Sequence, residues 1–502
     1  LSLTLDGQAG TVATLLAAFP ARTGEDFPGL AVVHAIADLD RLHLDQASAH
    51  LDVARAYAAT TPPDRQYRLR MAIASLDLLS ARLRGHFDGV FEQVDALPPP
   101  HAGQSNADVA LGNDLRAVAL LNLGVTEAWS LRLEDSEKYL REGAALARDI
   151  GRPYLEVACL AHLGFAATSH SFTLARRHCQ DAIAQAARHG WDAEPVIAPA
   201  QVTLGGVLIW TGEFDRGEQW LERARRATGA GGEPGIRLLL HLFSAMLAAA
   251  RSQYREALAE FAAARQVQEL MAADHALTSR VIAWTIATEA RLGNTGQARA
   301  TLAALDDRRA AAGEIRNAAA VICLAEQDPA GARRELRAVL DADSPASAFR
   351  NLVEAHLLDA LACQDLDDPR AARVAVEQAL HLAEPHRLIL PFAMTGAWQL
   401  LATLPPQRTS HAALIADILD TLHGAAPGRA RGPAEELSPS ELRVLRYLPT
   451  NLTRPEIASA LSVSLNTVNT HIRRIYSKLS ATDRSSAVQR GRELRLLSSS
   501  RA

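Results

Sequence analysis

The residues Leu437–Leu497 read LSPSELRVLRYLPTNLTRPEIASALSVSLNTVNTHIRRIYSKLSATDRSSAVQRGRELRLL, and they carry the strongest structural signal in this chain. Ser438 is followed by Pro439 and, three residues after the serine, by Glu441, which is the spacing of a helix capping box. A second start signal follows at Thr453, with a proline and a glutamate in the next three positions. The two signals predict two short helices that follow each other closely.

A third helix is predicted after the turn at residues 462–465. Its apolar residues recur every three or four positions and predict a single buried stripe made of Val468, Ile472, Ile475 and Leu479. The opposite side of this helix carries Asn466, Thr470, Arg473 and Ser477. No acidic residue stands between Glu456 and Asp483, whereas an ordinary exposed helix mixes acids and bases. Asparagine can pair with adenine, arginine with guanine, and threonine can touch a thymine methyl group, so this face suits base edges.

The charge of the segment agrees with this interpretation. Nine Lys and Arg against four Asp and Glu lie in residues 437–494, which gives a net charge of +5, whereas the whole chain carries −5. A basic module on an acidic body is the electrostatic footprint of a protein that binds duplex DNA. The alternative, one more helix pair of an upstream helical array, does not explain the capped turn or the acid-free polar face. The layout is that of a helix-turn-helix.

The segment closely resembles the LuxR/GerE-type helix-turn-helix family. The positions that match the family pattern are Leu437, Ser438, Pro439, Glu441, Val444, Leu445, Glu456, Ile457, Ala458, Leu461, Ser464, Thr467, Val468, His471, Ile475, Lys478, Leu479, Arg484, Ala487 and Val488. By this resemblance the scanning helix is about Thr453–Leu461 and the recognition helix about Asn466–Leu479. The last helix, Asp483–Leu494, resembles the helix through which family members dimerise.

The resemblance implies two sets of contacts with DNA. The side chains expected to face the bases are those of Asn466, Asn469, Thr470 and Arg473. The side chains expected near phosphates are those of Ser464, Thr467, Arg474 and Lys478. A homodimer closed through the last helix would read two half-sites about one helical turn apart.

The residues before this segment carry an internal repeat. A small residue is followed four positions later by an apolar one at Ala47/Leu51, Ser136/Leu140, Ala175/Cys179, Gly217/Leu221, Ala257/Phe261, Ala298/Leu302, Ala332/Leu336 and Ala372/Val376. A weaker copy is Val90/Val94. Each unit of about 40 residues predicts a helix, a short turn and a second helix, and a single hairpin cannot bury both its faces. The sequence therefore predicts an all-α chain in which a tetratricopeptide-like α-solenoid of about nine units precedes a four-helix LuxR-type domain.

We expect three parts along the chain. Residues 1–423 form a helical-repeat solenoid for sensing or interaction, and residues 437–497 form the helix-turn-helix domain. Residues 424–436 read GAAPGRARGPAEE, which has no apolar periodicity and predicts a flexible linker. A LuxR-type module after such a body resembles the MalT-like regulators, which carry an ATPase domain ahead of the solenoid. The chain starts at Leu1, already near the repeats, so our hypothesis is that it is the C-terminal part of such a regulator or a shortened version.

No pattern in the chain points to an enzyme. The two lysines, Lys138 and Lys478, do not stand in a Gly-Lys-Ser/Thr context, so no Walker-type ATPase is expected here. No HExxH, GxSxG or metal-spaced Cys/His cluster occurs, so we expect no catalytic residue, no metal and no cofactor. The cysteines form no CxxC pair and predict buried free thiols in a reducing cytoplasm: Cys159, Cys179, Cys323 and Cys363. No signal peptide is visible, and no apolar run predicts a membrane span.

The leading hypothesis is a DNA-binding transcription regulator of the cytoplasm. Its expected partners are double-stranded DNA, a second copy of the chain on that DNA, and a small-molecule or protein effector on the concave face of the solenoid. The alternative is a helical-repeat interaction scaffold whose C-terminal module only dimerises. A regulator binds its site with a steep salt dependence, whereas a scaffold binds DNA weakly at any salt concentration.

Overall fold

The computed structural model describes residues 6–18, 30–85, 106–229, 232–271, 275–341, 349–401, 409–424, 439–450, 452–461, 463, 465–478, 481, 483–493 and 496–497. Within these ranges the regular structure is helical and contains no strand, which confirms the prediction of an all-α chain. The chain divides into two compact units, Leu1–Leu414 and Ile415–Ala502. Almost all of the predicted linker, residues 425–436, lies outside the described residues, so the linker remains a prediction.

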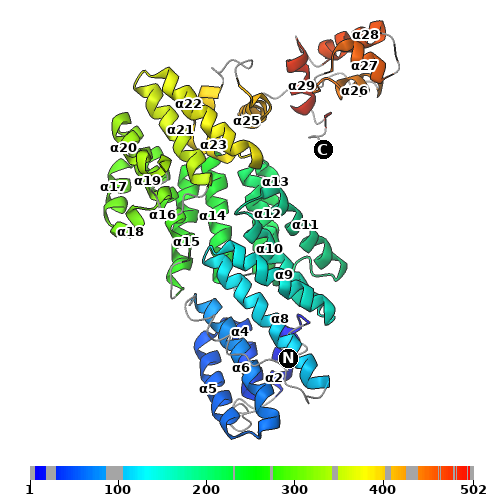
Figure 1. Cartoon of the computed structure of the whole chain (residues 1–502), viewed down its shortest axis with the longest axis vertical. Coiled ribbons are helices and arrows are strands. Elements are labelled where there is room, and N and C mark those ends of the chain that lie inside the picture. The colour runs from blue at the N-terminus through cyan, green and yellow to red at the C-terminus, as the bar shows by residue number, and fades with distance from the viewer. Residues whose placement is uncertain are drawn as a thin grey trace. The chain divides into compact units, whose positions relative to one another are not determined.

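The first unit is a stack of helical hairpins joined by short turns (Figure 1). The described hairpins are α4 (Ala31–Asp40) with α5 (Leu44–Thr60), α8 (Asn106–Trp129) with α9 (Leu133–Asp149), α10 (Pro153–Ala167) with α11 (Phe172–Arg188), α12 (Ala198–Trp210) with α13 (Phe214–Thr228), α14 (Pro234–Ala250) with α15 (Tyr254–Glu269), α16 (Thr278–Arg291) with α17 (Thr295–Ala303), α19 (Gly313–Ala325) with α20 (Pro329–Leu340), and α21 (Phe349–Asp365) with α22 (Pro369–Ala383). The solenoid prediction is thereby confirmed. The weak copy at Val90/Val94 lies outside the described residues.

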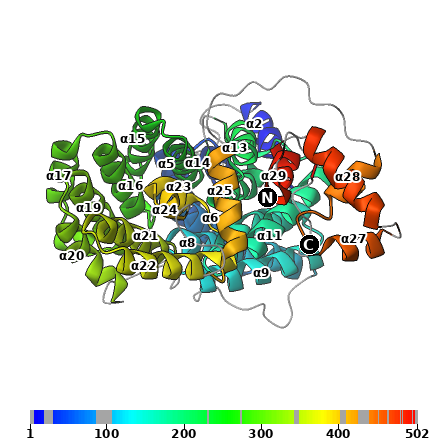
Figure 2. The same ribbon diagram turned by 90° about the horizontal axis from the view of Figure 1, so that it is seen from above.

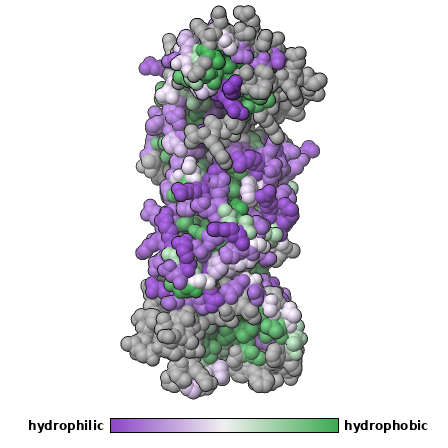
Figure 3. Space-filling view, turned by 90° about the vertical axis from the view of Figure 1, so that its right-hand side faces the viewer, coloured by the Kyte–Doolittle hydropathy of each residue, from purple (hydrophilic) through white to green (hydrophobic). Residues whose placement is uncertain are grey.

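Shorter or unpaired segments complete this part of the chain. They are α2 (Ala9–Ala17), α6 (Pro63–Arg84), η2 (Pro195–Ile197), α18 (Asp307–Ala310), η3 (Glu384–His386), α23 (Leu390–Thr395) and α24 (Trp398–Leu401). Most of the next helix, α25 (Ala412–Gly424), belongs to the second unit. None of the helices in the described ranges has both the length and the apolar character that crossing a membrane requires. Figure 3 shows that the surface over the outer helices α9, α11 and α13 is mainly hydrophilic, as expected for helices that bury only one face.

Small residues let the two helices of a hairpin approach closely. At the repeat anchors the small residue is buried, as at Ala175, which is fully inaccessible. The facing helix often carries a glycine there. A Cβ atom on Gly164 would lie 2.3 Å from the Sγ atom of Cys179, and one on Gly205 would lie 2.8 Å from a methyl carbon of Leu221. The anchor pattern thus marks real helix contacts, although the facing glycines were not predicted from the sequence.

The three-residue turns inside the described hairpins share one backbone conformation, whereas α10 and α11 are joined by a four-residue turn without it. The middle residue of the three-residue turn has a left-handed φ at Leu42, Leu131, Gly212, Ser252, Gly293, Gln327 and Asp367. The amide of the next residue then donates to the carbonyl five positions earlier, as in Glu213 N to Leu208 O at 2.8 Å. This bond satisfies a carbonyl at the end of the first helix. Glycine takes this left-handed position at Gly212 and Gly293, and the other three-residue turns place a non-glycine residue there.

All four cysteines are buried free thiols, as predicted. Burial raises the pKa of Cys159 to about 12 and also raises the pKa of Cys179. Both thiols therefore stay protonated and pack as small apolar groups between helices.

A buried polar cluster joins α6, α8, α10 and α14. Trp129 is 1% exposed, and its Nε1 donates to Glu233 at 3.0 Å. The guanidinium of Arg82 lies 3.3 Å from the same carboxylate. The rings of His162 and His275 lie against Trp129, with centroid distances of 5.8 and 5.1 Å. Burial lowers the pKa of each histidine to about 4, so both are neutral at pH 7.

Residues near the end of the solenoid contact helices from its middle repeats. Helix α23 contacts α12, α14 and α21 (Figures 1 and 2). The amide of Ile389, just before α23, donates to the carbonyl of Trp210 at the end of α12 over 2.9 Å. Arg350, at the start of α21, donates from Nη1 to the carbonyl of Thr168 over 2.9 Å. These contacts between residues far apart in sequence create the interior hollows described below.

Candidate nucleic-acid interface

The helix-turn-helix segment forms its own small core in the second unit. Its helices are α26 (Pro439–Leu445), α27 (Arg454–Ala460), α28 (Leu465–Lys478) and α29 (Arg484–Glu493). The buried residues at their centre are Val444, Leu445, Leu448, Ile457, Ala458, Val468, Ile472, Ile475, Ala487 and Leu497. Three members of the predicted apolar stripe, Val468, Ile472 and Ile475, are thus buried. The fourth, Leu479, lies outside the described residues.

The start of α27 follows the predicted chemistry. Thr453 is the N-cap of a capping box with Glu456 and is followed by a proline in the first turn. The Thr453 amide donates to the Glu456 carboxylate over 2.6 Å, and its hydroxyl does so over 2.7 Å. The hydroxyl and the amide of Thr453 lower the pKa of Glu456, because both stabilise the charged carboxylate. The scanning helix was predicted at residues 453–461, and α27 with its two cap residues spans the same positions. The cap predicted at Ser438 lies outside the described residues.

Helix α28 coincides with the predicted recognition helix, and it carries seven of the eight predicted contact residues. Side chains are described for Asn469, Thr467 and Lys478, which are all partly buried. The predicted residues that lie on α28 but whose side chains are outside the description are Asn466, Thr470, Arg473 and Arg474. Ser464, which precedes the helix, lies outside the described residues altogether.

Two of the predicted contact residues also bind within the domain. The Oδ1 atom of Asn469 accepts from Nη1 of Arg454 at 3.3 Å, which ties the recognition helix to the scanning helix. The ammonium of Lys478 lies 3.1 Å from the carboxylate of Glu441, which is 2% exposed. Lysine has three donors and one positive charge, so Lys478 fixes the end of α28 to α26. The sequence contained both partners, but no local pattern paired them.

Arg484 holds the end of the first helix. Its Nε atom donates to the carbonyl of Leu448 at 2.8 Å, and its Nη2 atom donates to the carbonyl of Thr450 at 2.7 Å. These carbonyls follow α26 and have no intrahelical partner, so the guanidinium stabilises the turn that leads into α27. Arg484 matched the family pattern in the sequence, but its hydrogen bonds to these two carbonyls are visible only in the structure.

The predicted dimerising helix, Asp483–Leu494, is realised as α29. Its buried side contributes Ala487, and a Cβ atom on Gly491 would lie 3.1 Å from Leu445. Arg492 on the same helix lies 2.6 Å from Asp420 of α25, within the second unit. Dimerisation through α29 remains a proposal. Among the described residues no cluster of three or more His, Cys, Asp or Glu side chains is arranged to hold a metal ion.

The solenoid and the C-terminal segment each match a known family. A family described as the MalT-like TPR region matches residues 112–405, which is more than half of the chain. The chain belongs to the MalT-like TPR family. A second family, described as bacterial regulatory proteins of the luxR family, matches residues 435–490. Both matches confirm the resemblances drawn from the sequence.

Individual proteins add detail to these family matches. The probable transcriptional regulatory protein NarL of Mycobacterium tuberculosis is 40% identical over 76 residues, which make up 15% of this chain. The chain thus covers 35% of the length of that protein. A crystal structure of a Rap protein complexed with competence and sporulation factor is 10% identical, with a TM-score of 0.51, over 72% of this chain and 98% of that one. The apo form of the quorum sensor NprR from B. thuringiensis is 13% identical, with a TM-score of 0.45, over 72% and 99% of the two chains. At 10% identity the likeness to the Rap protein concerns the fold alone.

Proposed function

We propose that this protein is a DNA-binding transcriptional regulator whose solenoid senses an effector. The observation that carries the proposal is the orientation of α28. Its stripe of Val468, Ile472 and Ile475 is buried in the LuxR-type core. With 100° between successive residues, Asn466, Thr470 and Arg473 then lie on the side of the helix away from that core. A short helix with an acid-free outer side is what a major groove admits.

In this proposal, residues of α28 and Ser464, which precedes it, contact the bases and the phosphates. Asn466, Asn469, Thr470 and Arg473 read base edges, because amide and guanidinium groups match the donor and acceptor pattern of the major groove. The proposed phosphate contacts are Ser464, Thr467, Arg474 and Lys478. The bond from Arg454 to Asn469 orients that amide, and the capping box at Thr453 holds the scanning helix that α28 packs against.

A net charge of +5 over residues 437–494 is modest for specific binding, so we propose that two copies bind together. Helix α29 is the proposed contact between the copies, and the half-sites then lie about one helical turn apart. The solenoid is proposed to bind an effector and to couple that event to DNA binding, which is a linkage between two sites on one chain. The Rap structure, with its competence and sporulation factor, is a precedent for a ligand on a related fold. The proposed place of action is the cytoplasm.

The test begins with the full chain and a site selected from random duplexes. Arg473→Ala is expected to weaken binding to that site by about 1–3 kcal/mol and to relax specificity at one base pair. The matched control is Arg443→Ala, which removes the same charge from the exposed side of α26 and is expected to leave base preference unchanged.

Salt dependence separates the proposal from the scaffold alternative. The logarithm of the binding constant should fall linearly with the logarithm of salt concentration, with a slope of about −0.9 for each phosphate contacted. A full chain that selects no site and binds duplex DNA weakly at every salt concentration contradicts the proposal and favours a scaffold. Unchanged affinity and specificity in Arg473→Ala would remove that residue from the base-reading surface.

A further inference from the structure

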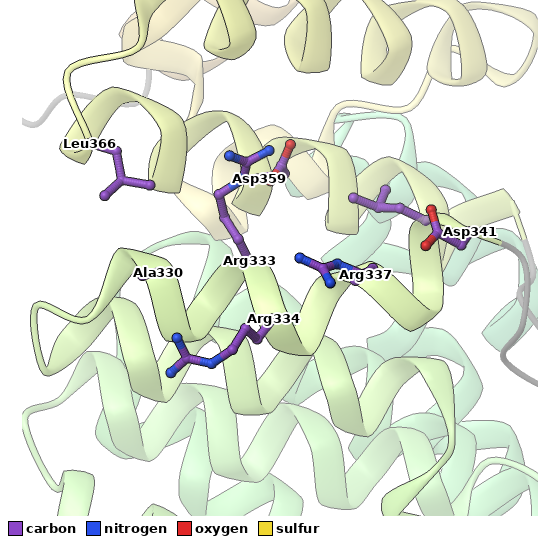
Figure 4. A pocket seen from close by; sticks show the side chains of 8 residues that line it. Ala330, Arg333, Arg334, Arg337, Asp341, Asp359 and Leu366 are labelled. Atoms are coloured by element: carbon purple, nitrogen blue, oxygen red, sulfur yellow. Dashed lines mark hydrogen bonds and ion pairs between the residues drawn. The ribbon is translucent and has the colours of Figure 1, made fainter.

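The first unit contains hollows of two kinds. The larger, of about 500 Å³, lies at the surface between α20 and α21, and Figure 4 shows Arg333, Arg334 and Arg337 along it. Arg333 lies 2.9 Å from Asp359, and Arg334 lies 3.5 Å from Asp328. These exposed, paired side chains are typical of a solvated helix face. The smaller hollows lie inside the solenoid, hold about 40 and 10 Å³, and share Trp210, Arg280 and Arg350 in their walls.

The interior hollows lie where distant repeats meet. Arg350 starts α21, and its guanidinium reaches the carbonyl of Thr168 between α10 and α11. Arg280 belongs to the first turn of α16, and Trp210 ends α12. The remaining walls of the 40 Å³ interior hollow are mainly apolar and include Phe165, Phe172, Val207, Leu242, Phe243 and Met246. Leu131, which is 42% exposed, lines the same hollow and gives it a side open to the outside.

The cation of Arg350 is held in an aromatic setting. Its guanidinium carbon lies 5.1, 5.8 and 5.9 Å from the ring centres of Phe349, Trp210 and Phe172. Its Nε atom is buried and has no hydrogen-bond partner. Burial, followed by the repulsion of the nearby Arg280 charge, lowers the pKa of Arg350 to about 9. A guanidinium is stabilised less by aromatic ring faces than by a carboxylate. The Arg350 cation therefore lacks a strong partner, and its buried Nε–H remains without an acceptor.

No carboxylate pairs with either arginine among the residues that the structure describes. Arg280 donates from Nη2 to Oδ1 of Asn351 at 3.3 Å. The other end of that amide, Nδ2, donates to Glu314 at 3.0 Å, so Asn351 separates the acid from Arg280. Glu354, which lines the smaller hollow, accepts from Asn317 at 3.3 Å. A buried guanidinium beside a second positive charge is costly when no carboxylate pairs with it directly, and the one acid that attracts Arg350 in its surroundings, Glu314, is bound by Asn351. Such arrangements are found where a ligand supplies the missing charge.

We propose that Arg280 and Arg350 form a binding site for a carboxylate that carries a small apolar group. The planar fork of Arg350 suits a carboxylate, which can accept from two of its nitrogens. The apolar walls from Phe172 to Met246 suit the attached group. The site rests on the proposed function in one respect, because it gives the solenoid of that regulator a chemical class of effector.

The size of the hollow limits the ligand. A cavity needs about 10–15 Å³ of this volume for each water-sized group. The 40 Å³ of the interior hollow therefore admits a carboxylate head and little more unless side chains move. A free short-chain acid or the C-terminal carboxylate of a peptide would meet this limit, because in both the body of the ligand can rest against Leu131 at the rim. The nearest matched probes are isovalerate and the dipeptide Ala-Val, with isovaleramide and Ala-Val-amide as counterparts in which an uncharged amide replaces the carboxylate.

The experiment measures binding of these probes to the full chain by tryptophan fluorescence and by the shift in melting temperature. The probe that matches the natural source, isovalerate or Ala-Val, is expected to bind, and its amide is expected to bind at least about tenfold more weakly. Arg350→Gln and Arg280→Gln are each expected to weaken binding of the acid by about tenfold or more. Arg299→Gln, which changes an exposed arginine paired with Glu326, is the control and keeps the wild-type affinity.

The outcomes distinguish a ligand-binding role of Arg350 from a purely structural one. If Arg350 serves only to join α21 to Thr168, Arg350→Gln lowers the melting temperature and leaves probe binding unchanged, which overturns the proposal. Equal binding of acid and amide also overturns it, as does the absence of binding by both acids at about 10 mM. DNA binding is measured separately without probe, so a chain that binds its DNA site but neither acid refutes this site and leaves the proposed function standing.

Discussion

Acid should destabilise the solenoid through the two histidines that pack on Trp129. His162 and His275 are buried, and burial lowers their pKa values from 6.5 to about 4. The unfolded chain therefore binds protons more readily than the folded chain at intermediate pH. For a group whose pKa is depressed on folding, the stabilisation is complete above the unfolded pKa and is lost as the pH falls through the folded one. The window for this loss runs from about pH 6.5 down to about pH 4.

The magnitude follows from these values. Between pH 7.5 and pH 5.0, a shift from 6.5 to about 4 costs about 2 kcal/mol of unfolding free energy for each histidine. The two together cost about 4 kcal/mol, a large part of the stability of an ordinary domain. Glu233 adds a loss of the same sign at lower pH, because the charges of Arg82 and His162 and the bond from Trp129 lower its pKa against the cost of burial.

A single substitution isolates the effect of one ring. The Nδ1 atom of His275 accepts from the amide of Leu277 at 3.1 Å, and the Oδ1 atom of asparagine occupies a similar place. His275→Asn therefore keeps this bond but removes the titrating group. The variant loses packing against Trp129 at every pH, whereas only the wild type loses the free energy linked to the pKa of His275 as the pH falls. The difference in unfolding free energy between wild type and variant should therefore shrink by about 2 kcal/mol from pH 7.5 to pH 5.0.

The assay is urea unfolding of the full chain, followed by circular dichroism at both pH values. His189→Asn is the matched control, because His189 is exposed and stacks on Trp191 with a centroid distance of 4.5 Å. It is expected to follow the wild type at both pH values. If the stability of His275→Asn fell with acid as steeply as that of the wild type, the argument from a neutral buried ring would be refuted.

Two further substitutions test contacts in the two units. Gly164→Ala places a methyl group 2.3 Å from the Sγ atom of Cys179 and should lower the free energy of unfolding by about 1–3 kcal/mol. Adding Cys179→Ala should restore part of this stability, and a double variant whose loss equals the sum of the two single losses would contradict the close approach. Lys478→Met removes the charge 3.1 Å from the buried carboxylate of Glu441. It should lower the stability of the second unit by about 2–3 kcal/mol and the salt slope of DNA binding by about 0.9; a stability loss with an unchanged slope would assign Lys478 to the fold alone.

Local patterns predicted what depends on neighbours in sequence. The capping box at Thr453 involves residues three positions apart, and the stripe of Val468, Ile472 and Ile475 lies on one helix, so each could be recognised from spacing alone. The repeat anchors, such as Ala175/Cys179, also lie within one turn of a helix. Their burial follows from the period of the α-helix, which the chain cannot avoid once it is helical.

Contacts across the fold were not predicted, because no local pattern records them. The bonds from Trp129 to Glu233 and from Arg350 to Thr168 span 104 and 182 positions. Which residues meet over such separations depends on the small rotation that each repeat adds to the stack. The sequence shows Arg350 only as one more charged residue near a helix start.

Local sequence patterns were enough to predict a helical-repeat body, from the spacing of its anchors, and a LuxR-type module, from its resemblance to that family. They also determined which helix carries the acid-free polar face. The packed fold was needed to show that Lys478 binds Glu441, that two histidines lie buried on Trp129, and that Arg280 and Arg350 line the same interior hollows. The physical reason is that these contacts join residues on separate helices, and the positions of those helices are set by packing between elements and not by the residues next to them in the chain.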